Sequence, residues 1–495
     1  MFDDYVRVDT TPLYKNSTGS TKVCHLLWGD GVRYAGEAGS GSRRRVKARG
    51  GRSGWVTQSA LGGQSLLEFY FIDVGQGDGI LIKTPGFRHI MIDGGFPRSY
   101  QDTGKNAADF VDWKFVRDYG MTTIELDALL ASHCDADHYG GLWDLLDVRQ
   151  SDELDAKAIH VEAFYHAGLS WWKKPGGSKE LGSYATHNGD TFWTQLLEDR
   201  THALAATAEN GDPALHGWWG SFIETVLQTN NRAGNPTPLQ RLSHLDAYVP
   251  GFGPDVAGEP AIHVLGPMGF SVEGQAALRR FSGGTSKNTN GVSLLLRVDY
   301  GRTRVLLTGD LNKASQQTLL EDYTGNRLAF QCDVAKACHH GSEDISYQFL
   351  QAMRPAATII SSGDNEGHDH PRPSIISASA TTGYLQLDEK EDDLLTPLVY
   401  STELSRSIDL GFPEKLEMRD PDGAVTDTLS GAALDRALLH ITKAKKDRVP
   451  LGRAMVVGGL IYGLINVRTD GDKILCATLD EQDNSWRIKT FTSRF

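Results

Sequence analysis

The feature that most constrains this chain is a cluster of histidines and aspartates that directly follows a short apolar segment. Residues 127–131 are predicted to form a buried β-strand, and His133, Asp135, Asp137 and His138 come immediately after it. A helix is predicted to begin here, so a single turn brings two imidazoles and two carboxylates together. This mixture of nitrogen and oxygen donors is typical of zinc or manganese ligation. The cluster therefore predicts a divalent metal site at the end of a strand.

Strands and helices are predicted to alternate on both sides of this cluster. The β-prone apolar runs are residues 66–74, 79–83, 89–92, 292–298, 303–307, 333–337 and 357–361. Helical spacing is found at residues 107–119, 313–323 and 344–353. Mixed elements of this kind predict an α/β layered domain.

Two later segments also place metal-binding residue types just beyond apolar strands. Asp310 follows the run 303–307, and His339 and His340 follow the run 333–337. Alone, each signal is weak, because an Asp after a strand is usually a helix cap and paired histidines often lie on the surface. Together they provide ligands from other strand ends, and they indicate a two-ion site that could clamp the oxygens of a displacement reaction.

These segments belong to a longer series of motifs. In chain order the motifs are Asp73-Val74-Gly75-Gln76-Gly77-Asp78, Ile92-Asp93-Gly94-Gly95, the His133–His138 cluster, Asn290 with Ser293, Thr308-Gly309-Asp310, His339-His340-Gly341-Ser342 and His370-Pro371. The series resembles the metallo-β-lactamase-fold hydrolases, most closely their competence-protein branch, which includes a soluble domain implicated in degrading DNA during uptake. The resemblance covers about residues 66–410 and implies an αββα sandwich.

The resemblance also implies a ligand set for two divalent ions, either zinc or manganese. The implied ligands are His133 and Asp135 for the first ion, Asp137, His138 and His340 for the second, and Asp310 as the bridge. Asp135 stands where most of the family has a histidine, which favours harder ions. His339 is the alternative to His340.

The chemistry implied by the resemblance is hydrolysis by a water molecule that the two ions activate. Asp137 and His370 are the expected catalytic residues, with His370 bonding a phosphate or protonating the leaving oxygen. An ordinary loop histidine is the other interpretation of His370, and His368 competes for the role. Tentative substrate contacts are His339, Lys336, Asn290 and Ser342, although Lys336 at a strand end could equally point at solvent.

Residues 1–62 are predicted to form a small all-β barrel in front of the hydrolase domain. The order of their short strands, and the sequence Gly54-Trp55-Val56, resemble bacterial Src-homology-3-like domains. Six cations between Arg43 and Arg52 have no acid among them. This basic run indicates either a solvated loop or a contact for nucleic acid or an acidic protein partner.

The hydrolase domain is predicted to span residues 63–430 with an insertion at about 165–260. The insertion holds Trp171, Trp172, Trp193, Trp218 and Trp219, which are half of the ten tryptophans. They indicate either a small satellite core or a surface that stacks a base or a sugar. Residues 431–495 are predicted to form a helix at 432–446 and strands near 461–467 and 473–479, packed on the core.

Charge and composition limit the remaining classes of function. Fifty Lys and Arg against 63 Asp and Glu give a net charge of −13, so a polyanion would need a local basic groove or metal ions. The longest apolar run, residues 454–465, is shorter than the roughly 20 residues of a membrane span. Five scattered cysteines and the acidic start favour the cytoplasm, with no export signal and no membrane.

The sequence therefore predicts a metal-dependent phosphodiesterase, most concretely a DNA nuclease. A small phosphodiester, such as a cyclic nucleotide or a phosphocholine ester, is the alternative substrate. A third interpretation is an adaptor protein whose barrel binds a partner and whose metal site is vestigial.

Overall fold

The chain divides into two compact units in the computed structural model. The first unit combines Met1–Ser405 with Tyr462–Phe495, and the second is Arg406–Ile461. The residues described are 2–36, 41–101, 104–362, 370–402, 409–411, 415–422, 424–430, 433, 439–442, 448–451, 456–458, 464–480 and 485–495. The predicted division after residue 430 is therefore wrong, because the chain leaves the first unit earlier and returns to it at Tyr462.

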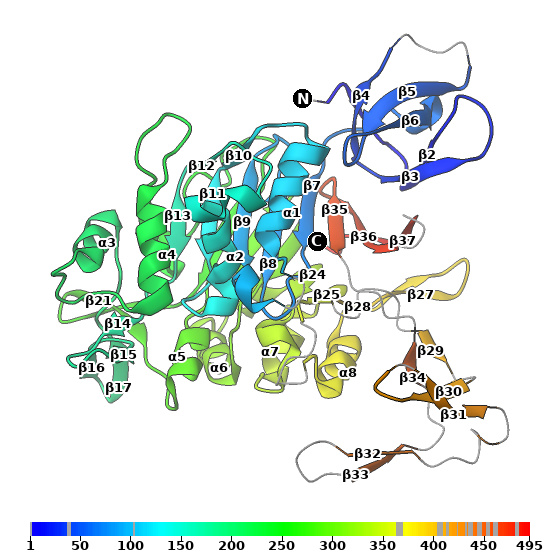
Figure 1. Ribbon diagram of the computed structural model, residues 1–495. Coiled ribbons are helices and arrows are strands. Elements are labelled where there is room, and N and C mark those ends of the chain that lie inside the picture. The colour runs from blue at the N-terminus through cyan, green and yellow to red at the C-terminus, as the bar shows by residue number, and fades with distance from the viewer. Residues whose placement is uncertain are drawn as a thin grey trace. The chain divides into compact units, whose positions relative to one another are not determined.

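The larger of the two main sheets of the first unit is a mixed sheet of nine strands (Figure 1). Its order is β18-β13-β11-β9-β8-β7-β35-β36-β37, and the four strands from β18 to β9 run parallel. The strands are β7 (Leu67–Phe71), β8 (Gly79–Lys83), β9 (His89–Gly94), β11 (Ala128–Ala131), β13 (Phe164–His166), β18 (Leu239–Arg241), β35 (Ile465–Thr469), β36 (Lys473–Asp480) and β37 (Ser485–Thr492).

A second mixed sheet of six strands has the order β19-β22-β23-β24-β25-β28. Its last four strands, from β23 to β28, run parallel. The strands are β19 (Ala261–Gly266), β22 (Leu295–Tyr300), β23 (Thr303–Leu307), β24 (Val334–Lys336), β25 (Ala357–Ile360) and β28 (Leu398–Ser401). The predicted alternation of strands and helices, a mixed α/β fold, is confirmed.

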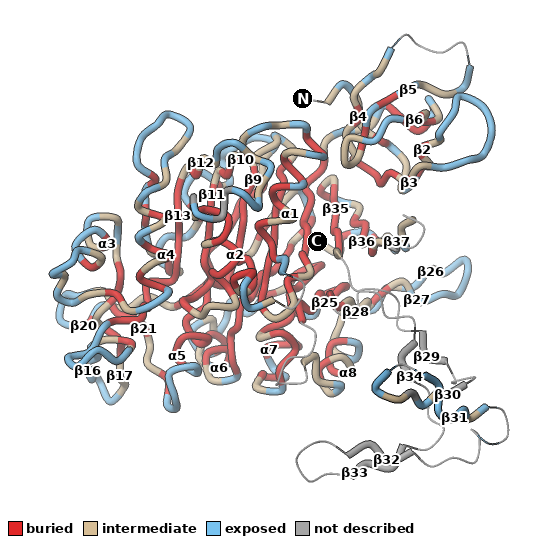
Figure 2. Tube along the Cα trace, viewed as in Figure 1, coloured by how far each residue is buried: buried red, intermediate tan, exposed pale blue. Residues whose placement is uncertain are grey.

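The two sheets share one apolar core, and helices cover their outer faces. Alternate residues of a strand point to opposite sides, so Leu130 packs toward the second sheet while Leu129 packs toward the helices. The helices α1 (Ala107–Trp113), α2 (Ala136–Leu146) and α4 (Gly217–Gln228) contribute to the core on the larger sheet. The helices α6 (Lys313–Asp322), α7 (Tyr347–Met353) and α8 (Pro373–Thr382) contribute to the core on the smaller one. Figure 2 shows buried residues concentrated along these layers.

The N-terminal segment forms its own antiparallel sheet around a separate core that includes Val46 and Val56. Its strands are β1 (Asp4–Tyr5), β2 (Thr10–Tyr14), β3 (Lys22–Leu27), β4 (Gly31–Tyr34), β5 (Arg43–Ala48) and β6 (Arg52–Thr57). The basic run lies mainly along β5, so the prediction of a solvated loop is wrong. Alternate residues put Val46 in the core and Arg43, Arg45 and Lys47 on the outer face.

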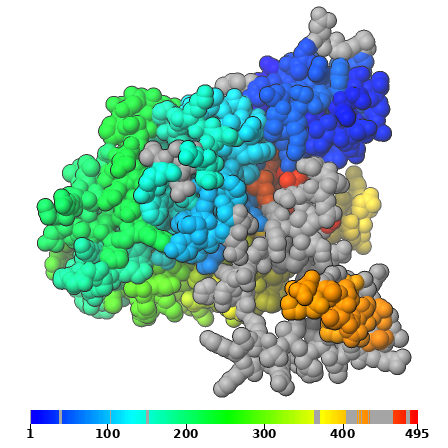
Figure 3. Space-filling model, in the orientation of Figure 1, coloured from blue at the N-terminus to red at the C-terminus, as the bar shows by residue number. Residues whose placement is uncertain are grey.

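The C-terminal strands hold this N-terminal module. Leu27 and Trp28 pack with Leu475 and Ala477 of β36. In Figure 3 the red C-terminal residues lie against the blue module. The guanidinium of Arg468 on β35 is buried, lies 2.7 Å from the carboxylate of Asp30, and donates to the carbonyl of Trp28. Apolar packing and a buried ion pair therefore join the two ends of the chain.

The segment predicted as an insertion is built into the larger domain. Strand β18 forms an edge of the nine-stranded sheet, and α4 packs on α2. The other elements here are α3 (Arg200–Thr207), β14 (Trp172–Lys173), β15 (Lys179–Glu180), β16 (Tyr184–His187) and β17 (Asp190–Trp193). Strand β17 pairs with β21 (Gln275–Arg279), which in turn pairs with β20 (Gly269–Val272), so the inserted structure extends past the predicted limit of residue 260.

The remaining described elements are short. In the first unit they are β10 (Thr123–Leu126), β12 (Ala158–Val161), α5 (Thr285–Gly291), β26 (Gln386–Asp388) and β27 (Asp393–Thr396). The second unit contains β29 (Asp409–Gly411), β30 (Lys415–Arg419), β31 (Val425–Ser430), β32 (Leu439–Thr442), β33 (Arg448–Leu451) and β34 (Val456–Gly458). The predicted helix at 432–446 is wrong where β32 lies, and most of its other residues fall outside the described ranges. Among the helices described, none has the length and hydropathy required to cross a membrane.

Replacing Arg468 by alanine is expected to lower the free energy of unfolding by about 3 kcal/mol, because Asp30 would be left buried without its cation. Chemical denaturation followed by tryptophan fluorescence measures the change. Arg117→Ala is the matched control, since its ion pair with Asp155 is exposed and is expected to contribute less than about 1 kcal/mol. Equal costs for the two variants would contradict this assignment.

Candidate metal centre

The candidate site lies where parallel strands of both sheets end. In the larger sheet, Asp93 lies near the end of β9 and His133 follows β11. In the smaller sheet, Asp310 follows β23 and His340 follows β24. Carboxyl ends of parallel strands share one edge of a sheet, and ligands of α/β proteins bind there. The packing of the two sheets brings both edges together.

The turn between β11 and α2 carries the first four predicted ligands. Asp135 occupies the position before the first residue of α2, and Asp137 and His138 lie in the first turn of the helix. The helix approaches the end of β9 so closely that a Cβ atom at Gly141 would lie 1.9 Å from the carbonyl oxygen of Gly94. Glycine at this position is therefore required for the approach that brings the turn to Asp93.

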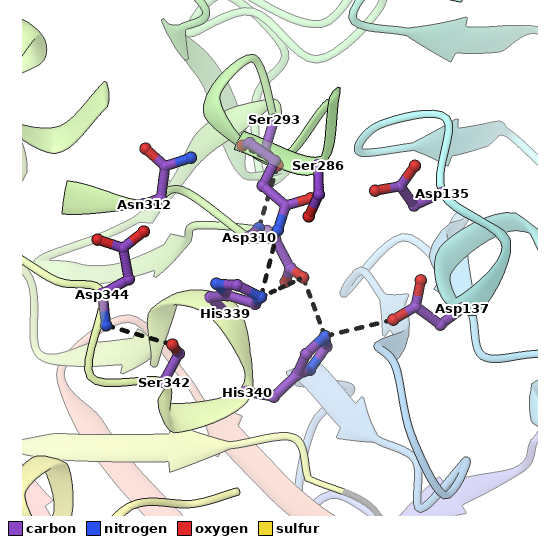
Figure 4. Close-up of polar contacts among 12 residues, drawn as sticks. Asp135, Asp137, Ser286, Ser293, Asp310, Asn312, His339, His340, Ser342 and Asp344 are labelled. Carbon is purple, nitrogen blue, oxygen red and sulfur yellow. Dashed lines mark hydrogen bonds and ion pairs between the residues drawn. The ribbon is translucent and has the colours of Figure 1, made fainter. Parts of the chain in front are cut away.

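Four of the six predicted ligands form one cluster. The ligand atoms of Asp137, His138, Asp310 and His340 all lie within 4.8 Å of one another. Oδ2 of Asp310 lies 3.2 Å from Nε2 of His138 and 3.0 Å from Nε2 of His340. Asp137 is 3.8 Å from the same nitrogen of His340. Figure 4 shows the contacts of Asp310 and Asp137 meeting at His340.

The other two predicted ligands lie beside this cluster as a pair. Nε2 of His133 is 3.6 Å from Oδ2 of Asp135, and the ring centroids of His133 and His138 are 4.1 Å apart. Asp135 also accepts a 2.6 Å hydrogen bond from the hydroxyl of Thr289. The structure thus brings together the four residues proposed for the second ion and its bridge, and it leaves a two-residue pair for the first.

The donor atoms fit divalent cations. The Nε2 atoms of His133, His138 and His340 are buried, and none makes a hydrogen bond of good geometry within the described residues, although Asp310 and Asp135 face them at 3.0–3.6 Å. A buried polar atom without a hydrogen bond is costly, and a bound cation would satisfy all three. The combination of imidazole nitrogens and carboxylate oxygens suits zinc or manganese.

Two carboxylates contact the Nδ1 atoms of the candidate histidine ligands and orient their rings. Oδ2 of Asp93 is 2.8 Å from Nδ1 of His138. Nδ1 of His340 donates to the carbonyl of Ser361 at 3.1 Å, with Asp78 at 3.4 Å. Such partners fix which imidazole nitrogen faces a metal. The sequence analysis named Asp78 and Asp93 only as parts of motifs and did not place either of them beside the metal ligands. A signal was available, because Asp93 ends an apolar strand just before Gly94-Gly95.

The cluster carries more negative than positive charge. Although burial opposes it, Asp310 raises the pKa of His340 to about 10, and it raises the pKa of His138 well above the usual value. Burial and the nearby charge of Asp137 raise the pKa of Asp135 to about 7. Protons on these groups balance the carboxylates when no metal is bound. The site is therefore built to hold cations.

Lys336 does not take the predicted place beside a substrate. Its side chain is fully buried, and its Nζ lies 2.5 Å from Asp78 and 3.5 Å from Asp310 and donates to the carbonyl of Gly309 at 2.9 Å. Neither the proposed phosphate contact nor the solvent-facing alternative is correct. As the last residue of β24 it points under the cluster, where its charge offsets the buried carboxylates.

A pocket of about 910 Å³ opens above the cluster. The predicted residues His339, Asn290, Ser342 and His370 line it. The side chain of His339 is 25% exposed and its Nε2 lies 3.9 Å from Asp310, so it faces the pocket rather than the four-residue cluster. The His370 ring is 5.8 Å from that of His339. His368, the alternative to His370, lies outside the described residues.

Comparisons with known proteins place a short part of this chain near competence proteins. No family model matches the chain. ComE operon protein 3 of Bacillus subtilis (strain 168) is 33% identical over 88 residues, which are 18% of this chain and 11% of that protein. Competence protein ComA of Neisseria gonorrhoeae is 36% identical over 87 residues, which are 17% of this chain and 12% of that protein. The match thus spans about a ninth of these relatives' length.

A solved structure described as a metal-dependent hydrolase of the beta-lactamase superfamily was also found. It is 13% identical, and the alignment covers 68% of this chain and 95% of that one with a TM-score of 0.28. Because that score is low, the fold and the site described above rest on this chain's own sheets and contacts.

Replacing His340 by alanine is expected to weaken metal binding more than 100-fold, because the variant loses a ligand. Loss of a residue that only orients a ligand already lowers metal affinity about 10–100-fold. Metal content after dialysis, measured by mass spectrometry, checks this. His339→Ala is the matched control, since His339 lies outside the four-residue cluster, and it is expected to retain the metal. Retention of the metal by both variants would contradict the assignment of His340 as a ligand. Loss of the metal only from His339→Ala would show that His339 is the ligand instead.

Metal affinity is expected to rise with pH between about pH 6 and 8. The raised pKa values of His138 and His340 keep these rings protonated in the metal-free site over this window, so a cation must displace protons. Each proton displaced gives about a tenfold gain in affinity per pH unit. Calorimetric titration in two buffers of different ionisation enthalpy counts the protons. A pH-independent affinity would refute this account.

Proposed function

We propose that this protein is a metal-dependent hydrolase that cleaves phosphodiester bonds, with DNA as its substrate. The observation that carries the proposal is the cluster of Asp137, His138, Asp310 and His340, whose buried imidazole Nε2 atoms face carboxylates and which opens onto a large pocket. Enclosed acidic clusters that bind divalent cations are suited to substrates whose negative charge the cations can neutralise.

Bound divalent cations would neutralise charge on a phosphoryl oxygen and make a water molecule more acidic. The cluster of Asp137, His138, Asp310 and His340 would hold one such ion, and His133 with Asp135 would complete a second site that shares Asp310. Zinc and manganese both suit these donors.

The chain's own groups then have distinct tasks. Asp137 is the most accessible carboxylate of the four-residue cluster, with 14% of its side chain exposed, and it is placed to accept a proton from water at the pocket floor. His370 lines the same pocket and would protonate the leaving oxygen or donate to a phosphate oxygen. His339 and Asn290, whose side chains are hydrogen-bonded to each other at 3.2 Å, and Ser342 would contact the substrate.

Nucleic acid is favoured as the substrate by two observations. Arg45 and Lys47 are exposed on the outer face of β5 and form no ion pairs within the described ranges, which leaves their charges available for a phosphate backbone; Arg43 on the same face stacks on Tyr14. The two relatives that share a segment with this chain are competence proteins by name. We further propose that the N-terminal module could hold an acidic protein partner in the same way, and that the protein acts in the cytoplasm.

A small phosphodiester is the second candidate substrate. The aromatic residues Trp171, Trp218 and Trp219 form one wall of the pocket, which could enclose a compound such as a cyclic nucleotide. Turnover of bis(p-nitrophenyl) phosphate, cyclic nucleotides and DNA, measured side by side, separates the two candidates.

Purified protein with manganese or zinc is expected to cleave linear or single-stranded DNA, and Asp137→Ala to reduce the rate at least about 100-fold by removing both a ligand and a proton acceptor. Gel analysis of a labelled oligonucleotide measures the rate. Asp255→Ala, an exposed aspartate outside the pocket, is the matched control and should cleave like wild type. Absence of cleavage by wild type, or equal cleavage by Asp137→Ala, would end the nuclease proposal.

A further inference from the structure

One tryptophan of the inserted segment differs from the others. Trp171, Trp172, Trp193 and Trp219 are at most 8% exposed and belong to the core of the larger sheet's helical layer. Trp218 is 39% exposed. Core packing therefore explains the four but not the fifth.

Trp218 is only partly packed, because it lies outside the main buried face of its helix α4. The buried face of α4 carries Trp219, Phe222, Ile223 and Val226, a spacing that places these residues on one side of the helix. Trp218 precedes this series and lies off that face. It lines the pocket that contains the metal cluster, so its exposed surface belongs to the pocket wall.

A second exposed aromatic residue supports Trp218 from the metal-bearing side. Tyr100 ends the short helix Arg98–Tyr100, which follows β9, the strand of Asp93, after a short loop. Phe96 in that loop also lines the pocket. Tyr100 is 62% exposed, and its ring lies 4.8 Å from the Trp218 ring at an angle of 68°. An edge contact of this kind fixes the indole while leaving much of its surface open.

Cationic groups also line this pocket. Lys179 and Arg372 are both lining residues. The ammonium of Lys179 lies 4.1 Å from the Trp171 ring and forms no ion pair within the residues described. The pocket therefore combines cations, a metal-binding cluster and an exposed indole. A flat ring joined to a phosphodiester has groups that match all three.

We propose that Trp218, held by Tyr100, stacks on an unpaired nucleobase next to the phosphodiester at the metal cluster. This subsite rests on the proposed function and refines its substrate to single-stranded nucleic acid or frayed ends. A base inside a duplex is already stacked on its neighbours and must be pulled out before it can reach the indole. Aromatic stacking accepts every base, so the subsite selects strandedness and not sequence.

The test measures binding by the full chain without added metal, so hydrolysis cannot interfere. The probes are a fluorescently labelled oligothymidylate of about ten nucleotides and an abasic oligomer of the same length. Anisotropy is expected to show wild type binding the thymidylate about 5- to 100-fold more tightly than the abasic oligomer. Trp218→Ala should lose this difference, and Trp218→Phe should keep most of it.

Tyr347→Ala is the matched control, because Tyr347 is 53% exposed and lies outside the pocket lining. It should bind both probes like wild type. Equal binding of the two probes by wild type, or an undiminished preference in Trp218→Ala, would overturn the subsite. A preference that depends on Trp218 without any phosphodiester cleavage in manganese or zinc would refute the proposed function and retain the subsite. Cleavage of DNA without any dependence of binding on the bases would support the proposed function and overturn the subsite.

Discussion

The excess of buried negative charge at the junction of the two sheets is the constraint on which the centre depends. Asp78, Asp93 and Asp310 are buried there, and the buried Lys336 is paired with Asp78 and Asp310. Buried carboxylates must be paired, because an uncompensated charge in the interior is strongly destabilising. The fold meets this requirement with protons on His138 and His340 or with metal cations in their place. Stability and metal binding are therefore coupled in the same few side chains.

The arrangement of the sheets explains how residues distant in sequence meet at this point. Each ligand follows a buried strand, and the apolar strand fixes where the polar residue emerges. The position of the cluster therefore depends on the sheet-to-sheet core, although none of its residues is apolar. A shift of either sheet would move Asp310 relative to His138, and the four-residue cluster would be lost. The same core thus serves stability and geometry.

Sequence reasoning identified candidate ligands because their chemistry is local to strand ends. Asp137, His138, Asp310 and His340 were each predicted from a short motif, and the structure brings them together. Side-chain direction was less accessible: a strand-end lysine can point outward or under the site, and only the position of Asp78 decides this for Lys336. The basic run around Arg45 was ambiguous because its alternation with small apolar residues is short. The limits of the insertion depended on pairing between β17 and β21, which are distant in sequence and carry no local signal.

The inserted structure packs on the core and also presents an exposed ring, and its composition alone does not separate these two tasks. Most of its tryptophans extend the core over α2, which anchors the segment to the helix that carries Asp137 and His138. An anchored segment can hold an exposed ring at a fixed distance from the metal cluster, whereas a mobile loop would lose entropy each time it ordered around a substrate. The buried tryptophans therefore preorganise the exposed one. An inserted segment can therefore add a surface to an α/β scaffold without disturbing its charged centre. The condition is that the apolar core of the segment continues the core of the scaffold.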